Sequence, residues 1–171
     1  MDGEGCIKKA YECILKGDFD EAIQWFLQAI HLEPDNASFH YKCSVSCTRS
    51  GKWELALHHA AEACALKPGN EEYRYHLDVV DARRLVSDAK LLLASGESSP
   101  AQVMEFLQEA RILDPLQAEA CYLAARCCIE LGRLQEAKQL AAEAFRLEPS
   151  MEEARLLYRQ IKRMSRRRGR D

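Results

Sequence analysis

The residues best suited to chemistry in this sequence are a histidine and two cysteines spaced three and four positions apart. His40, Cys43 and Cys47 would share one face of a helix, and imidazole and thiolate are ligands that Zn²⁺ prefers. The sequence contains no Cys-x-x-Cys pair, however, and no fourth ligand is evident. Free cysteine is also among the most buried residue types. We therefore expect these side chains to pack in a core, and we predict no metal and no other cofactor.

The other reactive candidates do not form a catalytic centre. His58 and His59 are adjacent, so on a helix their rings point about 100° apart and cannot share a ligand; we expect at least one of them in solvent. Cys127 and Cys128 are also adjacent, and neither has a nearby histidine to activate it. The sequence has no Gly-rich phosphate loop, no His-Glu-x-x-His and no nucleophile elbow. These features predict a protein that is not an enzyme.

Positive charge gathers in the last ten residues. Residues 162–171 hold six basic residues and one acid, a net charge of +5, whereas the rest of the chain holds 18 basic and 26 acidic residues, a net charge of −8. Such a run can contact phosphates or act as a nuclear import signal. The run has no aromatic residue for stacking on bases, and the acidic body would repel a polyanion. We expect a solvated tail or an import signal, and nucleic acid as an alternative partner. The basic residues concerned are Arg163, Arg166, Arg167, Arg168 and Arg170.

Composition predicts a folded chain outside the secretory pathway. The apolar fraction of 47% is typical of a protein that buries a core. The first residues carry two acids and lead into Lys8 and Lys9, unlike a signal or transit peptide. No apolar run is long enough to cross a bilayer, so we expect no membrane-spanning helix. Eight cysteines without a secretory signal favour free thiols. We expect a cytoplasmic protein, with nuclear entry as an alternative.

The elements that must position these side chains recur along the chain with a fixed period. Four pairs of residues lie 34 positions apart, and the same set returns near the C-terminus. The pairs are Gly17 and Gly51, Ala22 and Ala56, Ala29 and Ala63, and Pro34 and Pro68, and they return as Gly132, Ala137, Ala144 and Pro149. A period of this length predicts stacked pairs of helices. The repeats fall at about 3–36, 37–70, 71–117 and 118–151.

The cysteines follow the same register. Cys13, Cys47 and Cys128 occupy one equivalent position, and Cys6 and Cys121 share another. Both positions face inward on the first helix of each pair, where a thiol behaves as a small hydrophobic group.

The third repeat departs from the period. Pro68 and Pro115 are 47 positions apart, which is 13 more than 34. The insertion lies in residues 71–95, which contain neither Gly nor Pro. One long first helix is the simplest interpretation, and two shorter helices broken near Asp81 are the alternative. Ser99 and Gln102 form a capping box that opens the second helix of this repeat.

A final amphipathic helix is predicted after the last repeat. Ser150 and Glu153 have the spacing of a capping box that would open it. We expect this helix at 151–164, where it would cap the apolar end of the last pair. Residues 165–171 have no apolar side chain to bury, and we expect them to be disordered.

This pattern resembles the tetratricopeptide repeat (TPR) family: a 34-residue period, glycine at the turn, alanines seven apart with an aromatic such as Phe26 between them, and proline at the end. The resemblance covers residues 3–164. It implies an all-α solenoid of four helical hairpins, the third with an extended first helix, and a C-terminal capping helix. In this family the first helices line a concave groove that holds an extended peptide or a helix of a partner protein. By the family pattern, that groove is lined here by Ile7, Lys8, Tyr11, Tyr41, Lys42, Val45, Arg49, Tyr122, Arg126 and Ile129.

The function that the resemblance implies is that of an adaptor binding another protein. Tyrosines with interleaved Lys and Arg suit an apolar segment that carries carboxylates; the alternative is that the tyrosines only pack between helices. A co-chaperone that captures heat-shock chaperones through a carboxylate clamp is a further alternative. At best one of the five matching clamp positions is basic. The first three are Ile7, Tyr11 and Lys42; the last two are Glu72 and His76 if the third repeat is counted from Glu71, or Leu85 and Ala89 if it is counted from Arg84. The pattern predicts neither the partner's identity nor an oligomeric state.

Overall fold

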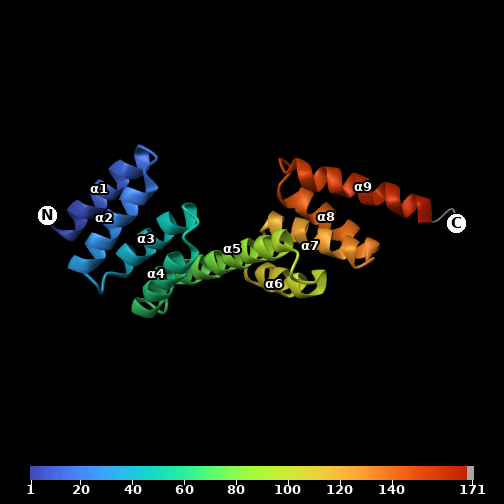
Figure 1. The fold of residues 1–171 in the computed structure, drawn as a ribbon. Helices are drawn as coiled ribbons and strands as arrows, with labels where there is room; N and C mark the ends of the chain where they lie inside the picture. The colour runs from blue at the N-terminus through green and yellow to red at the C-terminus, as the bar shows by residue number, and fades with distance from the viewer. Residues whose placement is uncertain (169–171) are drawn as a thin grey trace. The chain divides into compact units, whose positions relative to one another are not determined.

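A computed structural model describes residues 1–168, and within this range all regular secondary structure is α-helical (Figure 1). Nine helices follow one another along these residues. They are α1 (Gly3–Leu15), α2 (Phe19–Leu32), α3 (Ala37–Arg49), α4 (Trp53–Leu66), α5 (Glu71–Ser95), α6 (Pro100–Leu113), α7 (Ala118–Glu130), α8 (Leu134–Leu147) and α9 (Glu152–Arg168). They pack as helical hairpins, which confirms the predicted fold of four TPR-type repeats and a final capping helix.

The repeat period appears directly in the helix bounds. The first helices α1, α3 and α5 begin at residues 3, 37 and 71, and α7 and α9 begin at residues 118 and 152. The turn between the two helices of a hairpin uses a glycine in the left-handed region at Gly17, Gly51 and Gly132, with φ of 80°, 68° and 74°. Only glycine adopts this conformation readily, which explains why the turn residue repeats.

The structure divides into two compact units, Met1–Asp81 (unit 1) and Ala82–Asp171 (unit 2). In unit 1, α1 packs on α2, α2 on α3, and α3 on α4 (Figure 1). The largest side chains of its core are Ile23, Phe26, Phe39 and Val80. In unit 2, α6 packs on α7, α7 on α8, and α8 on α9. The core of unit 2 is built on Leu85, Val86, Val103, Leu107, Leu123, Leu140 and Ile161.

The insertion in the third repeat forms one uninterrupted helix, α5, of 25 residues. Of the two interpretations of this segment, the single long helix is therefore confirmed. It runs without Gly or Pro until Gly96, whose φ of 68° leaves the helical region. The boundary between the two units lies within this helix. None of the helices in residues 1–168 is long and apolar enough to cross a membrane.

The inward position of the cysteines is confirmed. Seven of the eight thiols are buried, and the eighth, Cys64, is half-buried. Both equivalent positions predicted from the repeat register are buried. One holds Cys13, Cys47 and Cys128, and the other holds Cys6 and Cys121. These thiols therefore pack between helices as small hydrophobic groups.

Two expectations about the C-terminal helix are corrected. Ser150 does not cap α9; its hydroxyl donates to the Glu148 carboxylate, and the helix begins at Glu152. The helix also continues to Arg168, so the expectation of disorder is wrong for residues 165–168. The physical reason is that no residue before Gly169 breaks the helix, and Arg is a good helix former. Arg170 lies outside the described residues.

Small side chains at the repeat positions are predicted to be essential for close helix packing. Ala22 in α2 has no exposed surface, so Ala22→Leu is expected to lower the free energy of unfolding by about 1–3 kcal/mol through overpacking. Ala61→Leu, on the exposed side of α4, is the matched control, and its effect should stay within about 0.5 kcal/mol. Urea unfolding followed by circular dichroism measures both. Equal destabilisation by the two variants would contradict the packing argument.

Candidate functional site

The clearest candidate site is a hollow of about 220 Å³ on unit 1, which we call the α1–α3 hollow. Helices α1, α2 and α3 supply its walls, and it lies wholly within unit 1. Its lining mixes aromatic, aliphatic and cationic side chains. The lining residues are Tyr11, Ile14, Phe26, Tyr41, Lys42, Val45, Ser46 and Arg49.

Aromatic rings form the apolar part of the hollow. Phe26 is 1% exposed and belongs to the core of unit 1. The ring of Tyr11 meets Phe26 edge-on, with the ring centroids 5.9 Å apart and the planes at 90°. Tyr11 itself is 45% exposed. The pair therefore offers an apolar surface with one edge in solvent, where a phenol hydroxyl can still reach a ligand.

Two cations lie beside this apolar surface, both on α3. The Lys42 Nζ atom lies 5.9 Å from the ring centroid of Tyr11 and 5.9 Å from that of Phe39. Arg49 is exposed, seven residues further along the helix, which is about 10 Å along the axis. A ligand with an apolar side chain and a carboxylate at either end would match this arrangement, because Arg and Lys make charge-assisted hydrogen bonds to carboxylates.

Tyr41 is held in place by its neighbours in α5. Its hydroxyl donates to the Glu72 carboxylate at 3.0 Å, and its ring stacks on Tyr73 with centroids 4.9 Å apart. Burial raises the pKa of Tyr41, and the hydrogen bond to Glu72 adds to this shift. Tyr41 therefore packs between helices, which agrees with the alternative interpretation that the tyrosines have a packing role. It also lines the hollow.

The other predicted groove residues lie elsewhere. Ile7 is 3% exposed and packs in the core of unit 1, so its placement on the groove surface is corrected: its face of α1 turns toward neighbouring helices. Lys8 is exposed on α1 and is not part of the hollow's lining. In unit 2, Tyr122 and Ile129 are half-buried against the core, and Arg126 is exposed.

Three lining residues were absent from the predicted groove. Ile14 lies one turn from Tyr11 on α1, a spacing that could have identified it. Ser46 neighbours Val45 and had no sequence signal as a ligand contact. Phe26 was assigned to the core, and the structure shows that its ring also reaches the hollow.

Two positions of the family's carboxylate clamp are committed to other contacts. Glu72 accepts the hydrogen bond from Tyr41. The His76 Nε2 atom lies 2.9 Å from the Ser44 hydroxyl, which donates to the Ala56 carbonyl oxygen at 2.7 Å. The His76 ring nitrogen must therefore donate to Ser44. A carboxylate and a histidine held in this way are poor counterparts for an incoming carboxylate.

A buried histidine pair joins α3 to α4. The His40 Nε2–H donates to the Pro34 carbonyl oxygen at 3.0 Å, so the His40 Nδ1 atom is an acceptor and takes a hydrogen bond from His59 Nδ1–H, also at 3.0 Å. Burial lowers the pKa of His59 to about 4, and the neighbouring His40 and His58 add to this shift. Both ring nitrogens of His40 are thus occupied by hydrogen bonds.

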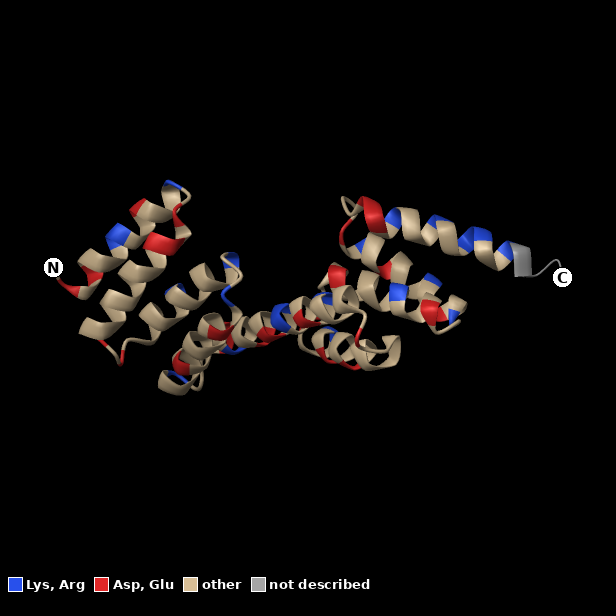
Figure 2. Cartoon of the chain, in the orientation of Figure 1, with Lys and Arg blue, Asp and Glu red and all other residues tan. Residues whose placement is uncertain are grey.

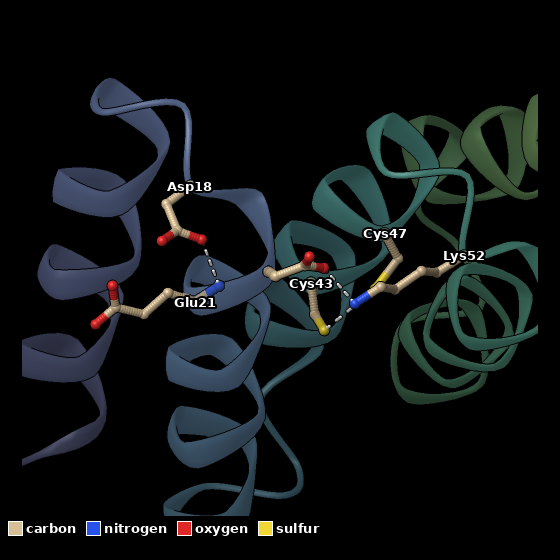
Figure 3. A network of polar contacts seen from close by, with 6 residues as sticks. Asp18, Glu21, Cys43, Cys47 and Lys52 are labelled. Atoms are coloured by element: carbon tan, nitrogen blue, oxygen red, sulfur yellow. Dashed lines mark hydrogen bonds and ion pairs between the residues drawn. The ribbon is translucent and has the colours of Figure 1, made fainter.

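The two thiols predicted to lie on the same helical face as His40 are close together in the core. Cys43 Sγ and Cys47 Sγ are 4.0 Å apart, and Lys52 pairs with Asp20 nearby (Figure 3). The hydrogen bond with Cys47 and burial raise the pKa of Cys43. Figure 3 also shows Asp18 capping α2, where its carboxylate accepts from the Glu21 backbone amide at 2.9 Å. Over residues 1–168, no group of three His, Cys, Asp or Glu side chains is arranged to hold a metal ion.

Comparison with solved structures gives similar folds at low sequence identity. A tetratricopeptide repeat protein from Parabacteroides merdae ATCC 43184 is 22% identical with a TM-score of 0.53, over 95% of this chain and 60% of that one. A MamA protein is 17% identical with a TM-score of 0.52, over 93% and 80% of the two chains. MamA 41-end from Desulfovibrio magneticus RS-1 is 14% identical with a TM-score of 0.51, over 96% and 95%. At these identities the likeness concerns the fold.

Comparison with protein families gives the same result from the sequence. Residues 10–44 match a family model described as TPR repeat, and residues 92–161 match one described as tetratricopeptide repeat. No curated protein matches the chain at a significant level. With the regular repeat register of the helices and the positive-φ glycine at each turn, these matches show that the chain belongs to the tetratricopeptide repeat family.

Proposed function

We propose that this protein is a non-catalytic adaptor that holds a carboxylate-bearing, partly apolar peptide of a partner protein in the α1–α3 hollow. TPR domains are in general protein–protein interaction modules. The observation that carries the proposal is the composition of the hollow, where an apolar surface formed by Tyr11 and Phe26 is lined on one side by the cations Lys42 and Arg49 of α3. Tyr and Arg contribute most of the binding energy at many interfaces.

The chemistry of the hollow favours a short extended segment as the occupant. A volume of about 220 Å³ accommodates one or two side chains, which a short segment can supply. An apolar side chain would lie against the Tyr11 and Phe26 rings, which are held in a fixed geometry. Acidic side chains or a C-terminal carboxylate would reach Lys42 and Arg49 at the edges. Fixed rings favour binding because little rotamer entropy is lost on association.

The experiment is a selection of ten-residue peptides from a random library on the full chain, followed by affinity measurements on the enriched peptides. We expect the enriched peptides to combine an apolar residue with a carboxylate. Tyr11→Ala with Arg49→Ala is expected to weaken their binding tenfold or more, about 1.4 kcal/mol or more, because both side chains line the hollow and are exposed.

Tyr75→Ala with Lys67→Ala is the matched control, since both residues are exposed on unit 1 and neither lines the hollow. The affinity of the control for the peptides should lie within about twofold of that of the unchanged protein. Both double variants should keep the helicity and the unfolding midpoint of the unchanged protein. An equal loss of affinity in the control, or enriched peptides without acidic groups, would contradict the proposal.

A further inference from the structure

In the repeat register, helix α9 occupies the position of a first helix. Residues 1–168 contain no second helix that would complete a hairpin with it. Helix α9 begins one repeat period after α7, as α3 begins one repeat period after α1. In the complete hairpins of regular length, the chain turns at a glycine two residues after the first helix ends, at Gly17, Gly51 and Gly132. The equivalent residue in α9 is Arg166, which is helical, so the chain does not turn back there.

In the complete hairpins, one face of the first helix packs against the second helix. His40 of α3 meets His59 of α4, and Ser44 of α3 donates to the Ala56 carbonyl oxygen of α4. A third position on this face of α3 holds the buried Cys47. The positions equivalent to these three in the other first helices hold small side chains with almost no exposed surface. These are Cys6, Ala10 and Cys13 in α1, and Cys121, Ala125 and Cys128 in α7.

The same positions of α9 carry Arg155, Arg159 and Lys162. Arg159 and Lys162 are exposed, and Arg155 is half-buried and paired with Glu152. The adjacent side of the helix packs normally, with Ala154 and Ile161 fully buried. A face that elsewhere receives a second helix is therefore cationic and open in α9, within the part of the chain that the structure describes.

Beyond the first turn of α9, the charge on this face is of one sign. After Glu153, α9 contains no acidic residue, and Figure 2 shows Lys and Arg recurring along the helix beyond its acidic first turn. Beside them lies a hollow of about 430 Å³, lined by Leu156, Arg159, Gln160, Arg163 and Met164. Leu156 is 53% exposed. A helix end that only needed to stay soluble would carry charges of both signs.

We infer that the open face of α9 binds an acidic amphipathic helix of another protein, which takes the place of the missing second helix. Its carboxylates would pair with Arg159, Lys162 and Arg163, and its apolar side chains would cover Leu156, which lies on the same side of the helix as Arg163. Arg and Lys residues three and four apart on one helix match Glu residues at the same spacing on a helix lying alongside.

The composition of the face favours a helix over a nucleic acid. Phosphates gain nothing from covering an exposed Leu156, whereas the apolar side of an amphipathic helix does. The aromatic residue of α9, Tyr158, packs against the core of unit 2 and offers no ring for stacking on bases. The surface lies outside the α1–α3 hollow, so this inference is independent of the proposed function.

The test uses the full chain and a fluorescent synthetic peptide of Leu, Ala and Glu, about five helical turns long, with Leu and Glu alternating on one helical face. A shuffled peptide of identical composition, without such a face, is the control ligand. We expect the amphipathic peptide to bind at least tenfold more tightly than the shuffled one in anisotropy titrations, and to gain helicity on binding. Raising the salt concentration should weaken binding.

Arg159→Glu with Arg163→Glu is expected to weaken binding of the amphipathic peptide at least tenfold. Arg83→Glu with Arg146→Glu makes the same change in net charge at exposed sites of unit 2 outside α9, and should change affinity less than twofold. The Tyr11→Ala with Arg49→Ala variant should bind the peptide normally. Equal affinity for the shuffled peptide, or an equal loss in the control variant, would overturn the inference; so would a DNA duplex that binds more tightly than the peptide and depends on Arg159 and Arg163.

Discussion

Replacing Phe26 by alanine is expected to lower the free energy of unfolding by about 3–5 kcal/mol. The ring is among the largest fully buried side chains and lies in the core of unit 1 with Ile23 and Phe39. It also supports the Tyr11 ring edge-on. Its removal leaves a cavity that the surrounding helices close only in part, so the lost packing adds to the lost hydrophobic burial.

Phe145→Ala is the matched control for this prediction, because Phe145 lies on α8 with 37% of its surface exposed. Its expected effect is about 1 kcal/mol or less. Urea unfolding, monitored by circular dichroism at equal protein concentration, gives both values. If the two variants were destabilised equally, Phe26 would not have the central packing role that its burial implies.

Acidification from pH 7 to pH 4 is expected to destabilise the protein by about 3 kcal/mol through His59 alone. Burial lowers the pKa of this side chain from its ordinary value of 6.5 to about 4. The unfolded chain therefore binds a proton in a pH range where the folded chain does not. The stability is fully present above pH 6.5, and it is lost progressively as the pH falls from 6.5 toward 4.

The measurement is the difference in unfolding free energy between the unchanged protein and His59→Gln at pH 7, 6, 5 and 4. The Gln amide can still donate to His40 Nδ1 but does not titrate in this range. The variant should therefore show a shallower loss of stability in acid. His58→Gln, at an exposed position, should keep the steep loss of stability in acid and shift it only slightly, because His58 is the smallest of the three causes that lower the pKa of His59. Parallel profiles for all three proteins would contradict the assignment to His59.

The sequence was sufficient to predict the helices because the fold repeats a local pattern. The spacing of glycines and prolines indicates where each hairpin turns and stops, and the first helices begin at the predicted repeat positions. The Ser99 and Gln102 capping box forms as predicted. The Ser150 prediction was wrong because a capping box needs the backbone of the Ncap residue to lie next to the first turn, and α9 begins two residues later. Spacing alone does not fix that geometry.

The candidate site was less predictable because it depends on which way each side chain turns. Tyr11, Tyr41, Lys42, Val45 and Arg49 line one hollow, and their role in binding stays a prediction. Ile7 lies only one turn from Tyr11 and nevertheless packs inward. The His40–His59 pair was also not predicted, because it joins two helices whose relative rotation sequence spacing does not specify. Such pairings require the packed structure.

The cysteines allow the opening of three hairpins to be followed separately by thiol labelling. Cys6 and Cys13 lie in the first, Cys43, Cys47 and Cys64 in the second, and Cys121, Cys127 and Cys128 in the last. Burial raises the pKa of Cys128 to about 11, which suppresses its thiolate while the hairpin stays closed. At the seven buried thiols an alkylating reagent therefore reacts when the hairpin opens, whereas the half-buried Cys64 can react without opening. Peptide mapping of the seven labelled thiols measures how often each hairpin opens without any engineered probe.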